Sequence, residues 1–316
     1  MTYLSGGLIQ AADYNGFVNN NAGANINATW NTTYGQTAIA SVSATNTVTA
    51  TQWASLVNTI TNMAAHQPTT ITARTAPVTG NTISILSAVN TDITTCYNNR
   101  FNATAVGTQF TGWTGTNSKT AATSGATWTI TFTNTVTFAS SAAASYFFNA
   151  GGLINIQVAK SAVGNLGDPE WNDLATTLCG VIRISKGAVS QVIAGTTYTG
   201  TTKIGGSGTP NILLAATGWD SLTAGAAGTI VYKQFADTAP YTNNFIQHTV
   251  AKGASSNTLT ITTLWSASDG DPISGGTAAS GATPGTAPCT IVTYFPPSTT
   301  YLTNSWGTPT VAATTA

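Results

Sequence analysis

Residues 127–158 read TWTITFTNTVTFASSAAASYFFNAGGLINIQV, and their alternation is the strongest fold signal in the chain. From Trp128 to Phe138 the apolar side chains share one parity, and threonines fill the other. This period of two is typical of a half-buried antiparallel strand pair. Asn134 interrupts the apolar parity, so we expect a turn or a bulge there. The run Tyr146–Phe148 is expected to continue the apolar sheet face before a glycine turn at 151–152 and a return strand.

Outward from this stretch, the N-terminal third of the chain reads as helical. Thr49 and Gln52 form a capping-box pair, apolar residues then recur at helical spacing to His66, and Pro68 stops the pattern. A second helix is predicted over 84–100 and a short one within 8–20. Residues 22–48 are expected to pair as short strands or to remain a loop. We therefore predict a small helical attachment module at 1–102.

The remainder, 103–316, is predicted to be a β-rich module. Asp168–Pro169 has the form of a helix start, so one inserted helix is expected near 169–179. Residues 181–185 and 189–193 read as a hairpin. Further strands are expected at 229–235, 245–250, 259–265 and 289–294, the last being the final main strand.

The long connections of this module are also predicted from composition. Residues 194–228 are expected to hold turns and a short strand anchored by Leu213, Leu214 and Trp219. Residues 266–288 read as an exposed loop, and the tail after Trp306 as extended or arm-like. The predicted fold class is α+β, mainly β: an antiparallel β-sandwich-like module preceded by a small helical N-terminal module.

The chain is poor in charge. Charged residues make up 6% of it, against about 25% in ordinary soluble domains, and nine Lys/Arg balance nine Asp/Glu. Low net charge favours association, so we expect a surface that is covered by copies of the chain or by neighbours. A secreted or thermally adapted β-protein whose Thr/Asn/Ser surface replaces charge is the alternative. The balance argues against nucleic-acid binding, and we expect no membrane span and no secretory signal. The three cysteines, Cys96, Cys179 and Cys289, are predicted to be free buried thiols.

Several short segments together resemble virion structural proteins of tailed bacteriophages, of the marine and cyanobacterial phage type. They are W-x-I-x-F followed by YFFNAGG-x-I in 128–154, Ala12–Asn15, Tyr34–Gln36, Thr51–Leu56 with His66, Asn99–Phe101, Tyr241–Ile246 and Tyr294–Ser298. The resemblance spans most of the chain. It implies a neck, tail or fibre component that is made in the host cytoplasm, resides in the virion, and has itself and other virion proteins as partners.

No residue pattern indicates an enzyme, and we predict no cofactor and no metal site. Asp269–Asp271 could hold calcium, but a turn explains it equally and the spacing is not that of an EF-hand. Asp168, Glu170 and Asp173 are interpreted as helix-start acids rather than an acid/base pair. His66 is expected to meet terminal helix carbonyls, and His248 to pair on a sheet surface.

The tryptophans divide by context. Four lie on apolar periodic faces and are predicted to be core: Trp53, Trp128, Trp171 and Trp265. Four lie among Gly, Thr and Asn and are our candidate interface residues: Trp30, Trp113, Trp219 and Trp306. The leading hypothesis is a non-enzymatic structural virion protein that acts through homo-oligomeric assembly. The alternative is a carbohydrate-binding adhesin or receptor-binding fibre tip that contacts host-surface glycans through exposed tryptophans.

Overall fold

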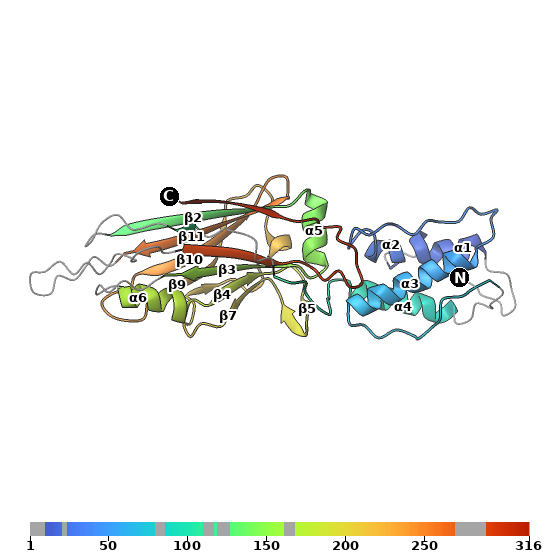
Figure 1. Ribbon diagram of the computed structural model, residues 1–316, viewed down its shortest axis with the longest axis horizontal. Helices are drawn as coiled ribbons and strands as arrows, with labels where there is room; N and C mark the ends of the chain where they lie inside the picture. Colours follow the sequence, from blue (N-terminus) through green and yellow to red (C-terminus); the bar gives the residue numbers. More distant parts are fainter. Residues whose placement is uncertain are drawn as a thin grey trace, which may run out of the picture.

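The computed structural model describes residues 10–20, 24–79, 86–109, 117–118, 127–160, 168–268 and 289–315. Figure 1 shows helices α1 to α4 grouped at one end of an elongated molecule and two β-sheets occupying the rest. The architecture is α+β and mainly β, as the sequence predicts. We call the first part the helical module and the second part the sandwich.

The helical module is built from short and long helices around one core. They are α1 (Ala11–Asn15), the π-helix η1 (Gly16–Asn20), α2 (Ile26–Thr29), α3 (Ala50–His66) and α4 (Leu86–Asn98). The Thr49 side chain caps α3 through the predicted capping box with Gln52. Trp53 of α3 lies edge-on to Tyr14 and Phe17, which joins α1 and η1 to the core. The region predicted as short strands or a loop, 22–48, contains helix α2 followed by a loop over 36–48, and its described residues, 24–48, form no strand.

The sandwich contains two main antiparallel sheets. The five-stranded sheet has the order β1 (Asn117–Ser118), β12 (Cys289–Phe295), β3 (Leu153–Ala159), β4 (Val181–Ile184) and β7 (Thr201–Ile204). The six-stranded sheet has the order β13 (Thr310–Thr315), β2 (Trp128–Thr137), β11 (Thr258–Ala267), β10 (Phe245–Lys252), β9 (Thr229–Phe235) and β8 (Ile212–Leu213). Their inward side chains form one continuous core.

Asn134 does not turn the chain, contrary to the prediction. β2 runs unbroken through it, and Asn134 takes an inward position opposite Ile261 of β11. Apolar side chains point inward and threonines point outward on both sides of Asn134, and this alternation places the one polar residue in the core. Its amide is fully buried and neither amide atom has a hydrogen-bond partner among the described residues. A buried amide without a partner destabilises the fold that contains it.

Replacing Asn134 by valine is therefore expected to stabilise the protein. The change removes the unpaired amide and puts a branched apolar side chain on a strand, so the free energy of unfolding should rise by about 1–3 kcal/mol. Urea denaturation followed by circular dichroism measures this. The exposed Asn46→Val substitution, in the loop formed by residues 36–48, serves as the control. A loss of stability in Asn134→Val would mean that the amide has a partner after all.

The segment after β2 is a helix rather than the predicted strand face. α5 covers Ser141–Asn149, and the Ser140 hydroxyl accepts a hydrogen bond from the Ala143 amide at its start. The alanines of this run favour helix more strongly than Tyr146–Phe148 favour strand. The return strand exists as β3, but it joins the five-stranded sheet and does not pair with β2.

The hairpin predicted over 181–193 is also wrong. β4 pairs with β3 and β7, whereas β5 (Gln191–Ile193) pairs with β6 (Thr196–Tyr198). The buried Gln191 side chain holds this arrangement, because it donates to the carbonyls of Phe101 and Phe148. These contacts direct β5 toward α5 and the end of α4 instead of along β4.

The connections were predicted in part. Trp219, in the short 3-10 helix η3 (Trp219–Ser221), is a core anchor, but Leu213 and Leu214 are 36% and 41% exposed and anchor nothing. The predicted strands 229–235, 245–250, 259–265 and 289–294 are confirmed. The tail is extended as expected, yet β13 pairs with β2, so β12 is not the last strand. The loop predicted over 266–288 begins later than expected, because Ser266 and Ala267 are buried residues of β11. From 269 on, the predicted loop lies outside the described residues.

The inserted helix is confirmed and has two parts, α6 (Asp168–Asn172) and the π-helix η2 (Asp173–Leu178). Trp171 and Leu174 are buried, and the Trp171 ring lies between Trp128 and Trp265. This contact fixes α6 and η2 against the inner face of the six-stranded sheet. The side chains of Asp168 and Pro169 lie outside the described set.

A buried polar joint links the helical module to the sandwich. Gln36 donates to the Thr303 carbonyl (3.0 Å) and accepts from the Thr303 backbone amide (2.8 Å). The Gln67 amide donates to the Tyr34 hydroxyl (2.9 Å), and the Tyr34 ring belongs to the sandwich core. Because Gln36, Gln67 and Tyr34 are buried and hydrogen-bonded, the two parts are held together by more than a linker.

Cys96 and Cys179 are buried free thiols, as predicted, and Cys289 is a half-buried one. Among the described helices, none combines the length and the apolar character that crossing a bilayer requires.

Candidate functional site

The tryptophans proposed as interface residues are mostly core residues. Trp219 and Trp306 are each 1% exposed, and Trp219 stacks on Phe148 at 5.1 Å between ring centroids. Trp30 is half-buried and packs against both cores. Trp113 lies outside the described residues. The Gly-rich context misled the prediction because glycine there permits close backbone packing over the ring and does not signal exposure. At Gly218, for example, an added Cβ would meet the Ser185 carbonyl at 2.5 Å.

Neither histidine is placed for catalysis. His66 is fully buried with its ring edge-on to Tyr34 at 5.2 Å, and the helix end that acts on it is the backbone of Ala150 at the C-cap of α5, not the end of its own helix. His248 is buried on the inner face of β10, where Nδ1 lies 2.9 Å from the Thr263 hydroxyl and the ring stacks on Tyr232. Burial lowers the pKa of His66 to about 4 and that of His248 to about 3.

These histidines should make stability depend on pH. In the folded chain both stay neutral, whereas in the unfolded chain each titrates near 6.5, so between about pH 6.5 and 4 the unfolded state binds more protons. Stability is then fully present above pH 6.5 and falls as the pH falls. We expect a loss of about 2 kcal/mol per histidine by pH 5.

Urea denaturation at pH 7.5, 6 and 5 measures this slope. The variants His66→Phe and His248→Phe should each flatten it, which separates the histidine contribution from that of the carboxylates. A slope that is unchanged in both variants would rule this origin out.

One acidic group is unusual. Glu170 is 7% exposed, and one of its carboxylate oxygens has no donor among the described residues. Burial raises its pKa; Thr238 opposes this by hydrogen bonding, and Asp237 and Asp173 add to it. Within the described ranges, no three His, Cys, Asp or Glu side chains are grouped so as to hold a metal, and Asp269–Asp271 falls outside them.

One whole face of the sandwich carries almost no charge. We call it the outer sheet face: the outward side chains of the six-stranded sheet. Every outward position of β2 is threonine, and the register sets further threonines beside them on β11, β10 and β13: Thr258, Thr260, Thr262, Thr249, Thr310 and Thr314. Thr135 and Thr260 lie 3.4 Å apart across the strands.

The other side of the outer sheet face is mostly apolar, with Gln247 of β10 as a neutral polar residue among its members. Ile212, Ile230, Phe235, Phe245 and Leu264 point outward from β8 to β11, and Leu214 lies at the edge. Ile230 and Leu214 are 37% and 41% exposed. Lys233 is the one charged side chain that the described strands place on this face, and its ammonium lies 3.6 Å from the centre of the Phe245 ring. Burial lowers the Lys233 pKa.

A polar hollow of about 830 Å³ opens at the far end of the sandwich from the helical module. The register places Phe235 and Phe245 beside the first residues of β2, at the end of the six-stranded sheet opposite the one that leads into α5. We call this hollow the distal hollow. It is lined by Leu178, Ser207–Thr209, Asn211, Gln234–Asp237 and Thr242–Asn243.

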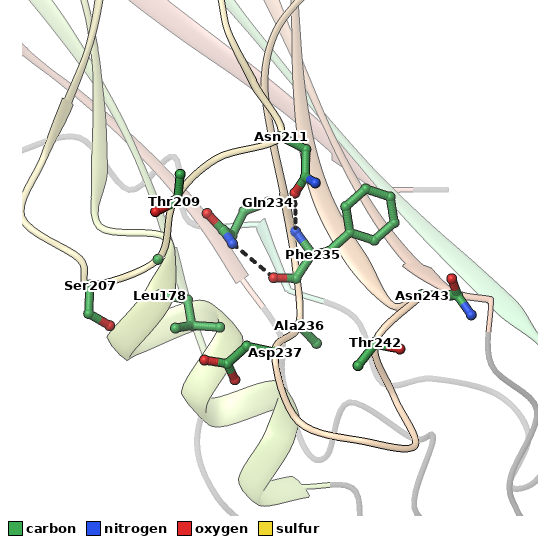
Figure 2. A pocket seen from close by; sticks show the side chains of 11 residues that line it. Leu178, Ser207, Thr209, Asn211, Gln234, Phe235, Ala236, Asp237, Thr242 and Asn243 are labelled. Carbon is green, nitrogen blue, oxygen red and sulfur yellow. Dashed lines mark hydrogen bonds between the residues drawn. The ribbon is translucent and has the colours of Figure 1, made fainter.

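Figure 2 shows how the hollow is held in shape. The Asn211 side chain accepts from the Phe235 backbone amide (3.3 Å), and Gln234 Nε2 donates to the Phe235 carbonyl (2.9 Å). The backbone amide of Ser207 donates to the Thr177 carbonyl (2.8 Å), which ties the loop after β7 to η2. Lys203 fixes that loop further, because its ammonium donates to the carbonyls of Gly206 and Gly208.

Sequence reasoning did not find either surface as a site. The outer sheet face follows from the threonine parity of 129–137, but only the register shows that neighbouring strands extend it. The distal hollow combines three segments far apart in sequence, and no local motif marks it.

No family model, no curated protein and no solved structure matches this chain. Its function is accordingly argued from the chemistry of these two surfaces.

Proposed function

We propose that this chain is a non-enzymatic structural protein that assembles with copies of itself through the outer sheet face, as a component of a tailed-phage virion. The composition of the outer sheet face supports self-assembly: one half is threonine, the other half is mostly apolar, and Lys233 is the one charge from the described strands. A second copy suits this face because two nearly neutral surfaces meet with little repulsion, and the one charge, Lys233, lies on β9 with its ammonium 3.6 Å from the centre of the Phe245 ring.

The size of the outer sheet face supports this partner. Six strands spaced about 4.8 Å apart, with eight to ten residues in the longest ones, give a surface about 24 Å wide and 25–30 Å long. Its footprint is on the order of 600–700 Å², close to the roughly 800 Å² per partner that stable interfaces bury. Sheets that pack face to face do so through such surfaces, at about 10 Å separation.

The virion part of the proposal is supported by the resemblance of segments such as 128–154 and 241–246 to tailed-phage structural proteins. The helical module, held at the opposite end from the distal hollow, would attach the chain to other virion proteins. If so, peptides of this chain will be found by mass spectrometry in purified phage particles rather than only in the soluble lysate.

Hydroxyl-radical footprinting tests the assembly face directly. We expect Leu264, Phe245 and Ile230 to be oxidised about threefold more slowly in concentrated than in dilute protein, because association covers them. Tyr301 and Val189, exposed elsewhere, are the internal controls and should not change. Protection of the controls with no protection of Leu264 would assign the contact to another surface.

A further inference from the structure

We infer that the distal hollow is a binding site for a neutral saccharide. Its volume of about 830 Å³ lies within the range of small-ligand sites, about 300–1,000 Å³. Apart from Leu178, Phe235 and Ala236, its side chains carry hydroxyl, amide or carboxylate groups, and Gly208 adds only backbone. A ligand that fits must therefore present many hydrogen-bonding groups.

The orientation of the Gln234 amide shows that the wall of the hollow contains a hydrogen-bond acceptor without a donor. Gln234 is 4% exposed, and its Nε2 is committed to the Phe235 carbonyl. This leaves Oε1, which has no partner among the described residues, as an acceptor without a donor. A buried acceptor in this state is costly, so a ligand that brings a donor gains affinity by pairing it.

Further acceptors lie nearby. Asp237 lines the hollow and is exposed, and Glu170, which interacts with Asp237, holds a second buried oxygen without a donor. Hydroxyl groups are donors that can pair with the Gln234 and Asp237 oxygens that line the hollow. Figure 2 shows Gln234 and Asp237 directed toward the same side, where Leu178 and Thr209 also lie.

The charge at the hollow disfavours an acidic ligand. The Asp237 carboxylate, which lines the hollow, would repel an acidic sugar. A neutral polyhydroxyl compound meets no such repulsion. Because the hollow lies at the end away from the helical module, it stays open when that module is attached to a partner.

Gly208 packs directly on the Gln234 amide. A Cβ at Gly208 would lie 2.9–3.0 Å from the Gln234 amide atoms, so the bare backbone allows the amide its present position. The loop and the amide thus form one fixed wall of the site.

Saturation-transfer NMR and calorimetry with four neutral disaccharides test this inference: lactose, cellobiose, maltose and N,N′-diacetylchitobiose. Glucosamine and galacturonate serve as charged comparators. We expect at least one neutral sugar to bind with a Kd of about 0.1–10 mM. Gln234→Met, which keeps the side-chain length and removes the unpaired oxygen, should weaken binding about tenfold, and Asp237→Ala should do so as well.

The control is Gln157→Met, an exposed position on β3 in the other sheet, which should leave binding unchanged. Circular dichroism reports folding; if Gln234→Met does not fold, the exposed Asp237→Ala carries the test. The inference is overturned if no neutral sugar binds at about 20 mM. Binding by the charged sugars alone, or binding that both folded variants retain in full, overturns it too. It is independent of assembly, which can succeed or fail separately.

Discussion

Thr131→Lys combined with Thr135→Lys is expected to convert the assembled protein into monomers. Both positions lie on β2, near the centre of the outer sheet face, opposite Leu264 and Thr260 of β11. Association would bury lysines from both copies against hydroxyl and methyl groups that offer no counter-charge. Unpaired buried charges cost several kcal/mol, so the affinity between copies should fall at least about a hundredfold.

The fold itself should tolerate these lysines. The two threonines are half-buried on the solvent side, and each change should cost less than about 1 kcal/mol of folding free energy. Thr196→Lys with Thr197→Lys adds the same charge to the exposed strand β6, outside the six-stranded sheet, and should leave assembly intact. Analytical ultracentrifugation of the two double variants makes the comparison. Equal assembly of both would place the contact elsewhere.

Trp219→Ala is expected to lower the free energy of unfolding by about 3–5 kcal/mol, the usual cost of emptying a large aromatic site in a core. The Trp219 ring stacks on Phe148 and also contacts Phe138, so it joins α5 to the six-stranded sheet. The Lys252 ammonium lies 4.5 Å from the ring centre on the same indole. The loss should appear in urea denaturation of dilute protein, where assembly does not contribute.

Leu214→Ala is the matched contrast for Trp219→Ala. Leu214 follows β8 in the same connection but is 41% exposed, and its truncation should cost less than about 1 kcal/mol. If Trp219→Ala instead left the monomer as stable as before and weakened assembly, the ring would be an interface residue, as its Gly-rich sequence context first indicated.

Local signals predicted the parts of the fold that local forces decide. Thr49 and Gln52 cap α3 through their own side chains, and the alternation of 128–138 fixes the two faces of β2. Signals failed where tertiary contacts decide. Asn134 stays in a core strand because its neighbours do, and the tail becomes β13 because β2 offers it an edge.

The two candidate surfaces were less predictable than the fold. The threonine parity of β2 is visible in sequence, but its continuation onto β11 and β13 depends on register between strands more than a hundred residues apart. The distal hollow depends on the loop after β7 reaching the end of β9. Gln234 Oε1, the unpaired acceptor at the hollow, can be identified only from the structure, because the Nε2 atom of the same amide is hydrogen-bonded to the Phe235 carbonyl.

Self-assembly of the chain can be measured by multi-angle light scattering of the purified 32.1 kDa protein across a dilution series. Assembly predicts a mass that is a whole multiple of 32.1 kDa and that persists on dilution, and the double variant at Thr131 and Thr135 should return it to 32.1 kDa. A mass of 32.1 kDa for the unmodified chain at every concentration would contradict self-assembly.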